Sequence, residues 1–470
     1  MPAASLASPI DDGTRGLPDG LDLALEETAR ALRTWSDAQG WLPPAEGGSG
    51  RVLPIAFEEL PDGIDALLLL DHEPEQTFEE DATALIVVSR HLLDDSRALT
   101  RALIHQAAHA VLWAYSHREP PLWQEASAVA LELQATRDAQ PYVDLFSERL
   151  HSRTRSLLPQ RLREAQGAGL WTFFLDVSRP AGSAALRRVW EELAAVPGDN
   201  LADALETAMR GPEGQGLGEE IATYLAWGLF TGDRDDGRHF PFAGALRGGV
   251  PDALHSEFPA SGAGTGIEAW GGSVVRLQTG TEPGGLRVQF QGDEPGRWSV
   301  LALFEGRSGG ALYSAWLPVD ADGRAELRFP WSGLRSATLI VANAASPGSA
   351  PARFGYSVWR EPSYPFELAG FQAEAEAAGI LVSWTTDGER DMAGWNLYRS
   401  LSPLTGFVRV NRLPIPAGGE VREPLRYLFL DTEAEPGRKY YYRLEGLTTG
   451  GFNEATTTVS ARTPGRIRQP

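Results

Sequence analysis

The stretch ALIHQAAHAVLW (residues 102–113) and the stretch PLWQEASAVALEL (residues 121–133) decide how the first half of this chain folds. Both are long and largely apolar, and neither has an internal glycine or proline, so both favour buried helices. Asp94 to Ser96 supply N-cap groups ahead of the first stretch, and Pro120 lies in the loop before the second. The pattern therefore predicts two consecutive helices joined by a short loop.

Hydrophobic periodicity extends this prediction outward to a larger α+β unit. Residues 21–40 carry apolar side chains at helical spacing, and three short runs, at 52–57, 66–70 and 84–89, have strand-like composition. Further helical patterns cover residues 142–165, 183–196 and 218–230. We therefore expect residues 1–250 to form one α+β domain with a small sheet.

The second half of the chain has a different sequence pattern, which predicts strands instead of helices. Between residues 255 and 362, Gly-rich turns separate short alternating strands, which is typical of a β-sandwich. Pro362 and Pro365 then indicate a linker, and a second sandwich is predicted over residues 368–464. The expected fold class is multidomain: an α+β domain followed by two all-β sandwich domains.

Composition limits the functions that this chain can have. Its 470 residues exceed what one hydrophobic core holds, and 42% of them are hydrophobic. A net charge of -21 and a single lysine, Lys439, argue against a nucleic-acid partner, and no apolar run is long enough to span a membrane. Because there is no cysteine, only histidine and carboxylate side chains are plausible metal ligands.

His105 and His109 lie four residues apart in the first predicted helix, so their imidazoles project from the same side. Histidine pairs at this spacing also occur as ordinary core residues, and the pair alone is not specific. Glu125 follows His109 by 16 residues, in the second helix. If the helices pack antiparallel, its carboxylate can reach the two imidazoles. Three such ligands with one open position are typical of a catalytic zinc site.

These two segments resemble the gluzincin metallopeptidases, including exported bacterial members, whose pattern is H-E-x-x-H followed on a later helix by a Glu within W-x-E-x-x-A. The resemblance covers about residues 20 to 240 and implies a small sheet, an active-site helix and a glutamate helix. It also implies that His105, His109 and Glu125 bind zinc.

Gln106 departs from the family pattern, because active members have the catalytic glutamate directly after the first histidine. A glutamine amide can hold a water molecule but does not accept its proton near neutral pH. Glu132 lies two helical turns beyond Glu125, where it is expected to support a histidine N–H or, as a less favoured alternative, to act as a replacement base.

Tyr224 and His239 are the candidates for the group that stabilises a developing oxyanion, as a Tyr or His does in gluzincins. Each also has an ordinary structural interpretation, as a helix-packing tyrosine and a loop histidine respectively. The sequence does not decide between these interpretations.

The last predicted sandwich resembles a fibronectin type III domain. Residues 380–400 alternate apolar and polar side chains over two strands, and Trp384 and Tyr398 are expected to face the core. After a Pro-Gly turn, three further side chains are predicted to lie on one face: Tyr440, which matches the tyrosine-corner position, Tyr442 and Leu444.

The sequence thus predicts a zinc-binding, metallopeptidase-like protein that is catalytically impaired and binds peptide or protein. Two alternatives stay open: an active zinc peptidase with a substitute base, and a metal-free extracellular adhesion or scaffold protein. By analogy with other chains that join such modules, we expect a secreted, periplasmic or cell-surface protein. The first residues, MPAASLASPIDDG, show no signal-peptide pattern.

Overall fold

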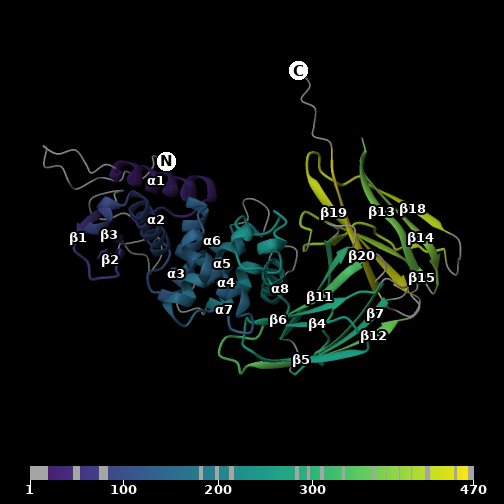
Figure 1. The fold of residues 1–470 in the computed structure, drawn as a ribbon. Helices are drawn as coiled ribbons and strands as arrows, with labels where there is room; N and C mark the ends of the chain where they lie inside the picture. Colours follow the sequence, from purple (N-terminus) through teal and green to yellow (C-terminus); the bar gives the residue numbers. More distant parts are fainter. Residues whose placement is uncertain are drawn as a thin grey trace, which may run out of the picture. The chain divides into compact units, whose positions relative to one another are not determined.

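The structure is a computed structural model, and its secondary structure divides the chain into helical and β regions (Figure 1). It describes residues 20–45, 53–72, 83–178, 184–195, 201–210, 216–280, 285–293, 297–306, 312–330, 334–361, 366–376, 378–390, 392–403, 405–418, 424–448 and 453–463. None of the described helices is long and apolar enough to cross a membrane.

Two compact units make up the chain. The first contains Met1–Ser152, Leu157–Arg210 and Thr231–Gly248, and the second contains Arg153–Ser156, Gly211–Phe230 and Gly249–Pro470. Both predicted sandwiches belong to the second unit.

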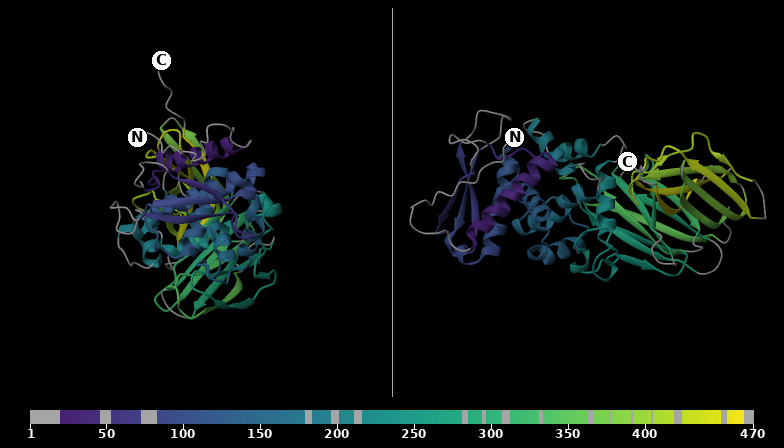
Figure 2. Two further views of the ribbon diagram at one scale, coloured as in Figure 1. Left: turned by 90° about the vertical axis from the view of Figure 1, so that its left-hand side faces the viewer. Right: turned by 90° about the horizontal axis from the view of Figure 1, so that it is seen from above.

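The first unit is α+β. Its described helices and strands are α1 (Leu21–Arg33), β1 (Ile55–Glu58), β2 (Ala66–His72), β3 (Thr83–Ser89), α2 (Ser96–Trp113), α3 (Pro121–Thr136), α4 (Val143–His151), α5 (Leu162–Val177), α6 (Ala185–Ala195) and α7 (Leu201–Met209). The sheet has the order β1-β3-β2, with β1 parallel and β2 antiparallel to the central strand. Helix α1 packs along α2, as the right-hand view of Figure 2 shows for the purple helix.

Helices α2 and α3 are antiparallel neighbours. The Trp113 indole at the end of α2 donates to Gln124 near the start of α3, at 2.8 Å. At the other end, Arg97 in the first turn of α2 pairs with Asp138, just beyond α3. These contacts fix the register that the site depends on.

The second unit contains one described α-helix, α8 (Leu217–Trp227), which packs on the five-stranded sheet of the middle sandwich. That sheet has the order β4-β6-β11-β8-β9, and it faces a four-stranded sheet of order β10-β7-β12-β5 across one apolar core. Its strands are β4 (Ala253–His255), β5 (Ala260–Ile267), β6 (Gly272–Gln278), β7 (Gly285–Gly292), β8 (Trp298–Gly306), β9 (Leu312–Leu317), β10 (Arg324–Pro330), β11 (Leu334–Asn343) and β12 (Ala352–Glu361).

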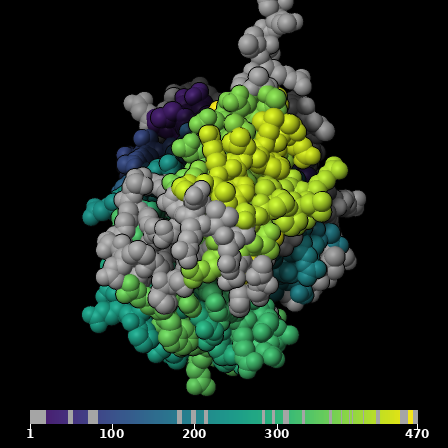
Figure 3. Space-filling view, turned by 90° about the vertical axis from the view of Figure 1, so that its right-hand side faces the viewer, coloured from purple at the N-terminus to yellow at the C-terminus, as the bar shows by residue number. Residues whose placement is uncertain are grey.

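The C-terminal sandwich, whose yellow surface is visible in Figure 3, consists of two antiparallel sheets. One sheet has the order β13-β14-β18, and the other has the order β16-β15-β19-β20, with β17 also paired to β15. The Tyr440 hydroxyl accepts a hydrogen bond from the Glu435 backbone N–H, which is the contact of a tyrosine corner. The strands are β13 (Phe366–Glu376), β14 (Gly379–Glu389), β15 (Met392–Ser400), β16 (Val408–Arg409), β17 (Ile415–Pro416), β18 (Leu425–Asp431), β19 (Lys439–Thr448) and β20 (Asn453–Arg462).

Two sequence predictions about these elements were wrong. The helix expected over residues 142–165 ends at His151, and a new helix begins at Leu162. Between them, Arg153–Ser156 belongs to the second unit, where the Arg153 guanidinium bonds to Asp252 and to a backbone carbonyl. Tyr398 does not fill the core of its sandwich: Trp395 and Leu397 do, whereas the Tyr398 hydroxyl donates to Glu445 on the sheet surface.

Candidate metal centre

Helix α2 positions the two histidines. Asp95 caps the helix by accepting hydrogen bonds from the backbone N–H groups of Arg97 and Ala98, at 3.1 and 3.0 Å. One helical turn separates His105 from His109, and their ring centroids are 4.9 Å apart. Both side chains lie on the face that meets α3, and each is 14% exposed.

Glu125 on α3 lies between the two histidines. Its Oε2 atom is 3.3 Å from His105 Nε2 and 3.3 Å from His109 Nε2. The carboxylate side chain is 12% exposed, so the cluster is mostly buried but retains some contact with solvent. Among the described residues this is the group of histidine and acidic side chains whose ligand atoms, all within 4.8 Å of one another, could hold a metal ion.

Glu132 contacts the opposite side of the His105 ring. Its Oε2 atom lies 2.9 Å from His105 Nδ1 and accepts a second hydrogen bond from the Tyr142 hydroxyl at 2.6 Å. A carboxylate only accepts, so Nδ1 carries the proton and Nε2 faces Glu125. Glu132 is 1% exposed, and its Oε1 atom has no hydrogen-bond partner among the described residues. Tyr142 and Glu132 therefore fix the orientation of the imidazole.

Helix α5 holds Glu125 from its other side. Gln166 Nε2 donates to Glu125 Oε1 at 3.1 Å, leaving Oε2 directed at the histidines. The helices approach closely here because Gly169 has no side chain: a Cβ at that position would lie 2.3 Å from a Val129 methyl carbon. The Thr172 hydroxyl also donates to the Ala126 carbonyl at 2.6 Å, which locks the two helices in register.

Charge within the cluster is distributed between histidines and carboxylates alone. Neither Glu125 nor Glu132 pairs with an arginine or lysine in the part of the chain that the structure describes. Burial opposes protonation of His105, yet its hydrogen bonds to the two carboxylates outweigh this and raise its pKa to about 10. Burial lowers the pKa of His109. Despite burial, hydrogen bonds from both histidines hold the pKa of Glu125 well below its ordinary value.

Two of the three ligand–ligand distances in this cluster match those around a tetrahedral divalent metal. Zinc bonds of about 2.0–2.2 Å to nitrogen and oxygen at tetrahedral angles place two ligand atoms roughly 3.3 Å apart. Glu125 Oε2 is 3.3 Å from each histidine Nε2. The hydrogen bond from His105 Nδ1 to Glu132 is the outer-shell contact that metal-bound histidines usually make.

The remaining predicted residues lie in different places. Gln106 follows His105 on α2 and is half-buried. Tyr224 is 1% exposed within α8 of the second unit. His239 belongs to the first unit, where its Nδ1 atom is 2.8 Å from Asp236 Oδ1. The oxyanion roles considered for Tyr224 and His239 stay predictions.

Sequence reasoning missed Tyr142 and Gln166. Tyr142 ends a short 3-10 turn, Gln140–Tyr142, and nothing in its local pattern distinguishes it from a core tyrosine. Gln166 lies in α5, whereas the sequence predicts a single helix over residues 142–165 that ends before it. No local signal identifies either residue, since both reach the site through packing between helices.

Comparisons with known proteins do not assign the chain to a family. No protein-family model matches it, and no curated protein matches it.

Solved structures give short, distant similarities. An Fn3-like protein from Clostridium thermocellum is 17% identical, over 21% of this chain and 93% of that one, with a TM-score of 0.16. The pre-peptidase C-terminal domain of a Bacillus anthracis collagenase is 12% identical, over 23% and 96%, with a TM-score of 0.18. The adhesin domain of Epf from Streptococcus pyogenes is 9% identical, over 46% and 76%, with a TM-score of 0.15. TM-scores this low support no argument about the site, which rests on its own geometry.

Proposed function

We propose that His105, His109 and Glu125 bind one zinc ion in a gluzincin-like centre whose hydrolytic activity is impaired. The observation that supports this most strongly is the pair of 3.3 Å distances from Glu125 Oε2 to the two Nε2 atoms, together with Glu132 on the far nitrogen of His105. Metals other than zinc also bind such ligand sets, and availability decides among them.

Gln106 is the reason for the proposed loss of activity. Bound zinc would polarise a water molecule, but hydrolysis also needs a base that takes the water's proton and later delivers it to the leaving amine. The glutamine amide is neutral and holds water only by hydrogen bonding. Losing a general base costs about 10² to 10⁴ in rate.

Glu132 is poorly placed to replace that base. It contacts His105 Nδ1, whereas the proposed metal ligand is Nε2, so the imidazole ring lies between the carboxylate and the metal position. Its Oε2 atom already accepts two hydrogen bonds, and the side chain is 1% exposed. This geometry favours the impaired enzyme over a peptidase with a substitute base.

The competing proposal is a metal-free protein in which the same side chains form a structural network. His105 lies between two carboxylates, and a protonated imidazole there satisfies both without any metal. In that case the cluster is structural, and the chain serves adhesion or scaffolding through its sandwiches. With zinc bound, we propose that the region around the ion binds peptide or protein. In both cases we propose an exported or surface-exposed protein, by analogy with other chains that join such modules.

Restoring the base tests the proposal. Casein hydrolysis is measured for the wild type, for Gln106→Glu, and for the double variant Gln106→Glu/His109→Ala, each with and without added zinc. We expect the wild type to be near background and Gln106→Glu to gain about 10²-fold or more. The double variant should return to background, because it lacks a ligand.

Two results would contradict this account. Wild-type hydrolysis equal to that of Gln106→Glu means that another base operates. Equal activity in the double variant means that hydrolysis does not depend on His109, and so comes from a contaminant or from another site. A substitution at another half-buried glutamine, Gln39→Glu at the end of the first helical segment, controls for the added negative charge.

A further inference from the structure

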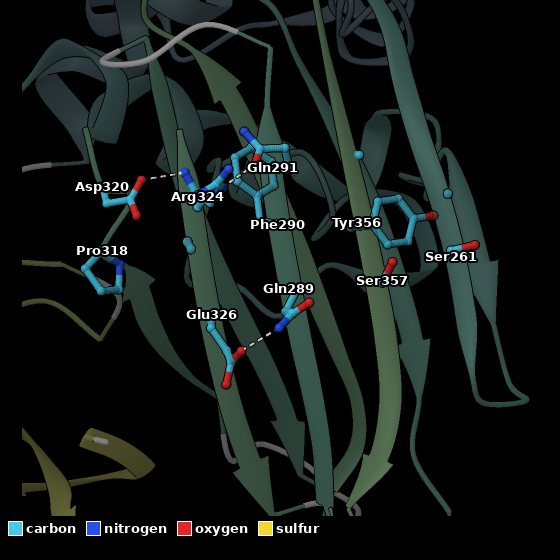
Figure 4. A pocket seen from close by; sticks show the side chains of 13 residues that line it. Ser261, Gln289, Phe290, Gln291, Pro318, Asp320, Arg324, Glu326, Tyr356 and Ser357 are labelled. Carbon is cyan, nitrogen blue, oxygen red and sulfur yellow. Dashed lines mark hydrogen bonds between the residues drawn. The ribbon is translucent and has the colours of Figure 1, made fainter. Parts of the chain in front are cut away.

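A groove of about 690 Å³ crosses the outer face of the four-stranded sheet in the middle sandwich (Figure 4). Along β7 and β12, alternate residues are buried in the core, and the intervening ones face outward. The outward set on this sheet is polar rather than apolar, which is why no second layer needs to cover it. This groove belongs to the second unit and does not involve the zinc cluster.

One row of hydrogen-bonding side chains runs straight across all four strands. Gln289 on β7 is the cross-strand partner of Glu326 on β10 and of Ser357 on β12. Ser357 is in turn the partner of Ser261 on β5. Figure 4 shows these four side chains at successive strands. Three strand spacings of about 4.8 Å give the row a length of roughly 14 Å.

Three polar atoms in this row have no protein partner among the described residues. Gln289 Nε2 donates to Glu326 Oε2 at 2.8 Å, so the amide is oriented with its Oε1 atom away from Glu326. That oxygen, and the hydroxyl groups of Ser357 and Ser261, form no hydrogen bond within the part of the chain that the structure describes. The row therefore offers one fixed acceptor and two hydroxyls that both donate and accept.

Side-chain size gives the groove its shape. Gly355 and the two serines keep the floor low over β12 and β5, while Arg324 and the β9–β10 turn raise the other side. That turn is rigid: Asp320 Oδ1 accepts the backbone N–H groups of Asp322 and Arg324 at 2.9 and 2.8 Å. A preformed wall reduces the entropy that a ligand must lose on binding.

The arginines along the groove all contact acidic or amide side chains. Glu326 binds both Arg287 and Arg328, at 2.8 and 3.0 Å. Arg324 bonds to Gln291 Oε1 at 2.9 Å and lies 3.7 Å from Asp322. Because each arginine is matched by a nearby acid or amide, the groove has no excess positive charge to attract a polyanion.

Trp359 does not line the groove itself but adds apolar surface beside it, one outward position beyond Ser357. The residue is 38% exposed, although it is among the largest of the sheet. The Arg287 guanidinium lies 5.7 Å from the ring centroid and fixes it in place. An exposed aromatic beside a row of neutral donors and acceptors matches a ligand with apolar C–H faces and many hydroxyl groups.

We propose that this groove binds a neutral saccharide, with Gln289, Ser357 and Ser261 contacting its hydroxyl groups and Trp359 packing on a sugar ring. The sheet face then anchors the chain to a neutral polysaccharide. The zinc cluster is not required for this binding.

Calorimetric titration of the full chain with cellohexaose, xylohexaose, mannohexaose and maltohexaose tests the proposal. A hexamer of galacturonic acid serves as the anionic comparison. The variants are Gln289→Leu, which removes the fixed acceptor, and Ser357→Tyr, which fills the groove. Arg353→Gln is the matched control, since it is exposed on the same strand outside the groove.

We expect at least one neutral hexasaccharide to bind with a Kd on the order of 10 µM to 1 mM. Gln289→Leu should weaken binding about fivefold or more, Ser357→Tyr should abolish it, and Arg353→Gln should leave it unchanged. Failure of all four neutral sugars to bind at millimolar concentration overturns the proposal. So does binding that persists in Gln289→Leu and Ser357→Tyr, or binding of the anionic hexamer alone. Melting curves confirm folding, and Gln289→Leu decides if Ser357→Tyr does not fold.

Discussion

Two buried carboxylate networks in this molecule look alike but are neutralised differently. In the first unit Tyr142 donates to Glu132 at 2.6 Å, and in the C-terminal sandwich Tyr442 donates to Asp431 at 2.6 Å. Asp431 also accepts two hydrogen bonds of 2.9 Å from Arg399. Glu132 instead meets His105, and no arginine or lysine pairs with it among the described residues.

A structural network and a metal centre differ in what neutralises the buried carboxylate. Arginine keeps its charge at any ordinary pH, so the network at Asp431 is complete within the protein. Histidine gains its charge from a proton or gives its lone pair to a metal, so the network at His105 depends on what binds there. The network at Asp431 therefore supports folding, whereas the network at His105 is suited to a metal ion.

The largest expected effect comes from breaking the network at Asp431. Asp431→Ala leaves the Arg399 charge and the Tyr442 hydroxyl without their partner, so we expect a loss of about 3 to 5 kcal/mol in unfolding free energy. Zinc content should not change. Urea unfolding followed by tryptophan fluorescence measures the loss, and a change below 1 kcal/mol would show that this network matters little to stability.

The next largest effect is a change of unfolding free energy with pH, which we expect only in the metal-free protein. The pKa of His105 is raised from 6.5 to about 10, so its stabilising effect is complete below pH 6.5 and disappears as the pH rises toward 10. Between pH 7 and 9, wild type in chelator should lose about 2 kcal/mol relative to His105→Gln. The zinc-loaded protein should show no such loss. Identical pH profiles for the two metal-free proteins contradict this.

Removing the hydrogen bond between His105 and Glu132 should lower zinc affinity more than it lowers the free energy of unfolding. Glu132→Gln replaces the carboxylate that accepts from His105 Nδ1, and such outer-shell changes lower zinc affinity about 10- to 100-fold. Competition with a fluorescent chelator measures the affinity. The matched control is Glu148→Gln, which changes an exposed carboxylate paired with Arg163. Equal affinities for the two variants would remove Glu132 from the proposed site.

The smallest effect is expected at Gln166. Gln166→Leu removes the hydrogen bond to Glu125 Oε1 while keeping similar volume, so zinc affinity should fall about fivefold. The same chelator competition detects it. Unchanged affinity would mean that α5 does not orient the Glu125 carboxylate.

The clustering of His105, His109 and Glu125 was predictable because its geometry is mostly local. Helical periodicity alone places His105 and His109 on one face, and a short loop makes an antiparallel α3 the simplest partner. Gln166 was not predictable, because its contact with Glu125 depends on how closely Gly169 lets α5 approach Val129. Such packing leaves no periodic signal in the sequence.

In the two β-sandwiches, too, periodic features were predictable and the finer placement of side chains was not. Alternating apolar residues predicted the strands, and Trp384, Tyr440 and Tyr442 are buried in the predicted core. Tyr398 was misplaced, because neighbouring aromatics at 395 and 398 are both compatible with an inward position, and the strand register decides between them.

Zinc stoichiometry tests the central proposal most directly. The full chain is purified with zinc present, dialysed, and analysed by inductively coupled plasma mass spectrometry beside His109→Ala. We expect one zinc per chain in the wild type and none in His109→Ala, with both proteins giving cooperative thermal unfolding. Wild type with no zinc above background, or a His109→Ala variant that retains the same zinc, would contradict it and leave the His105 network as a metal-free ion cluster.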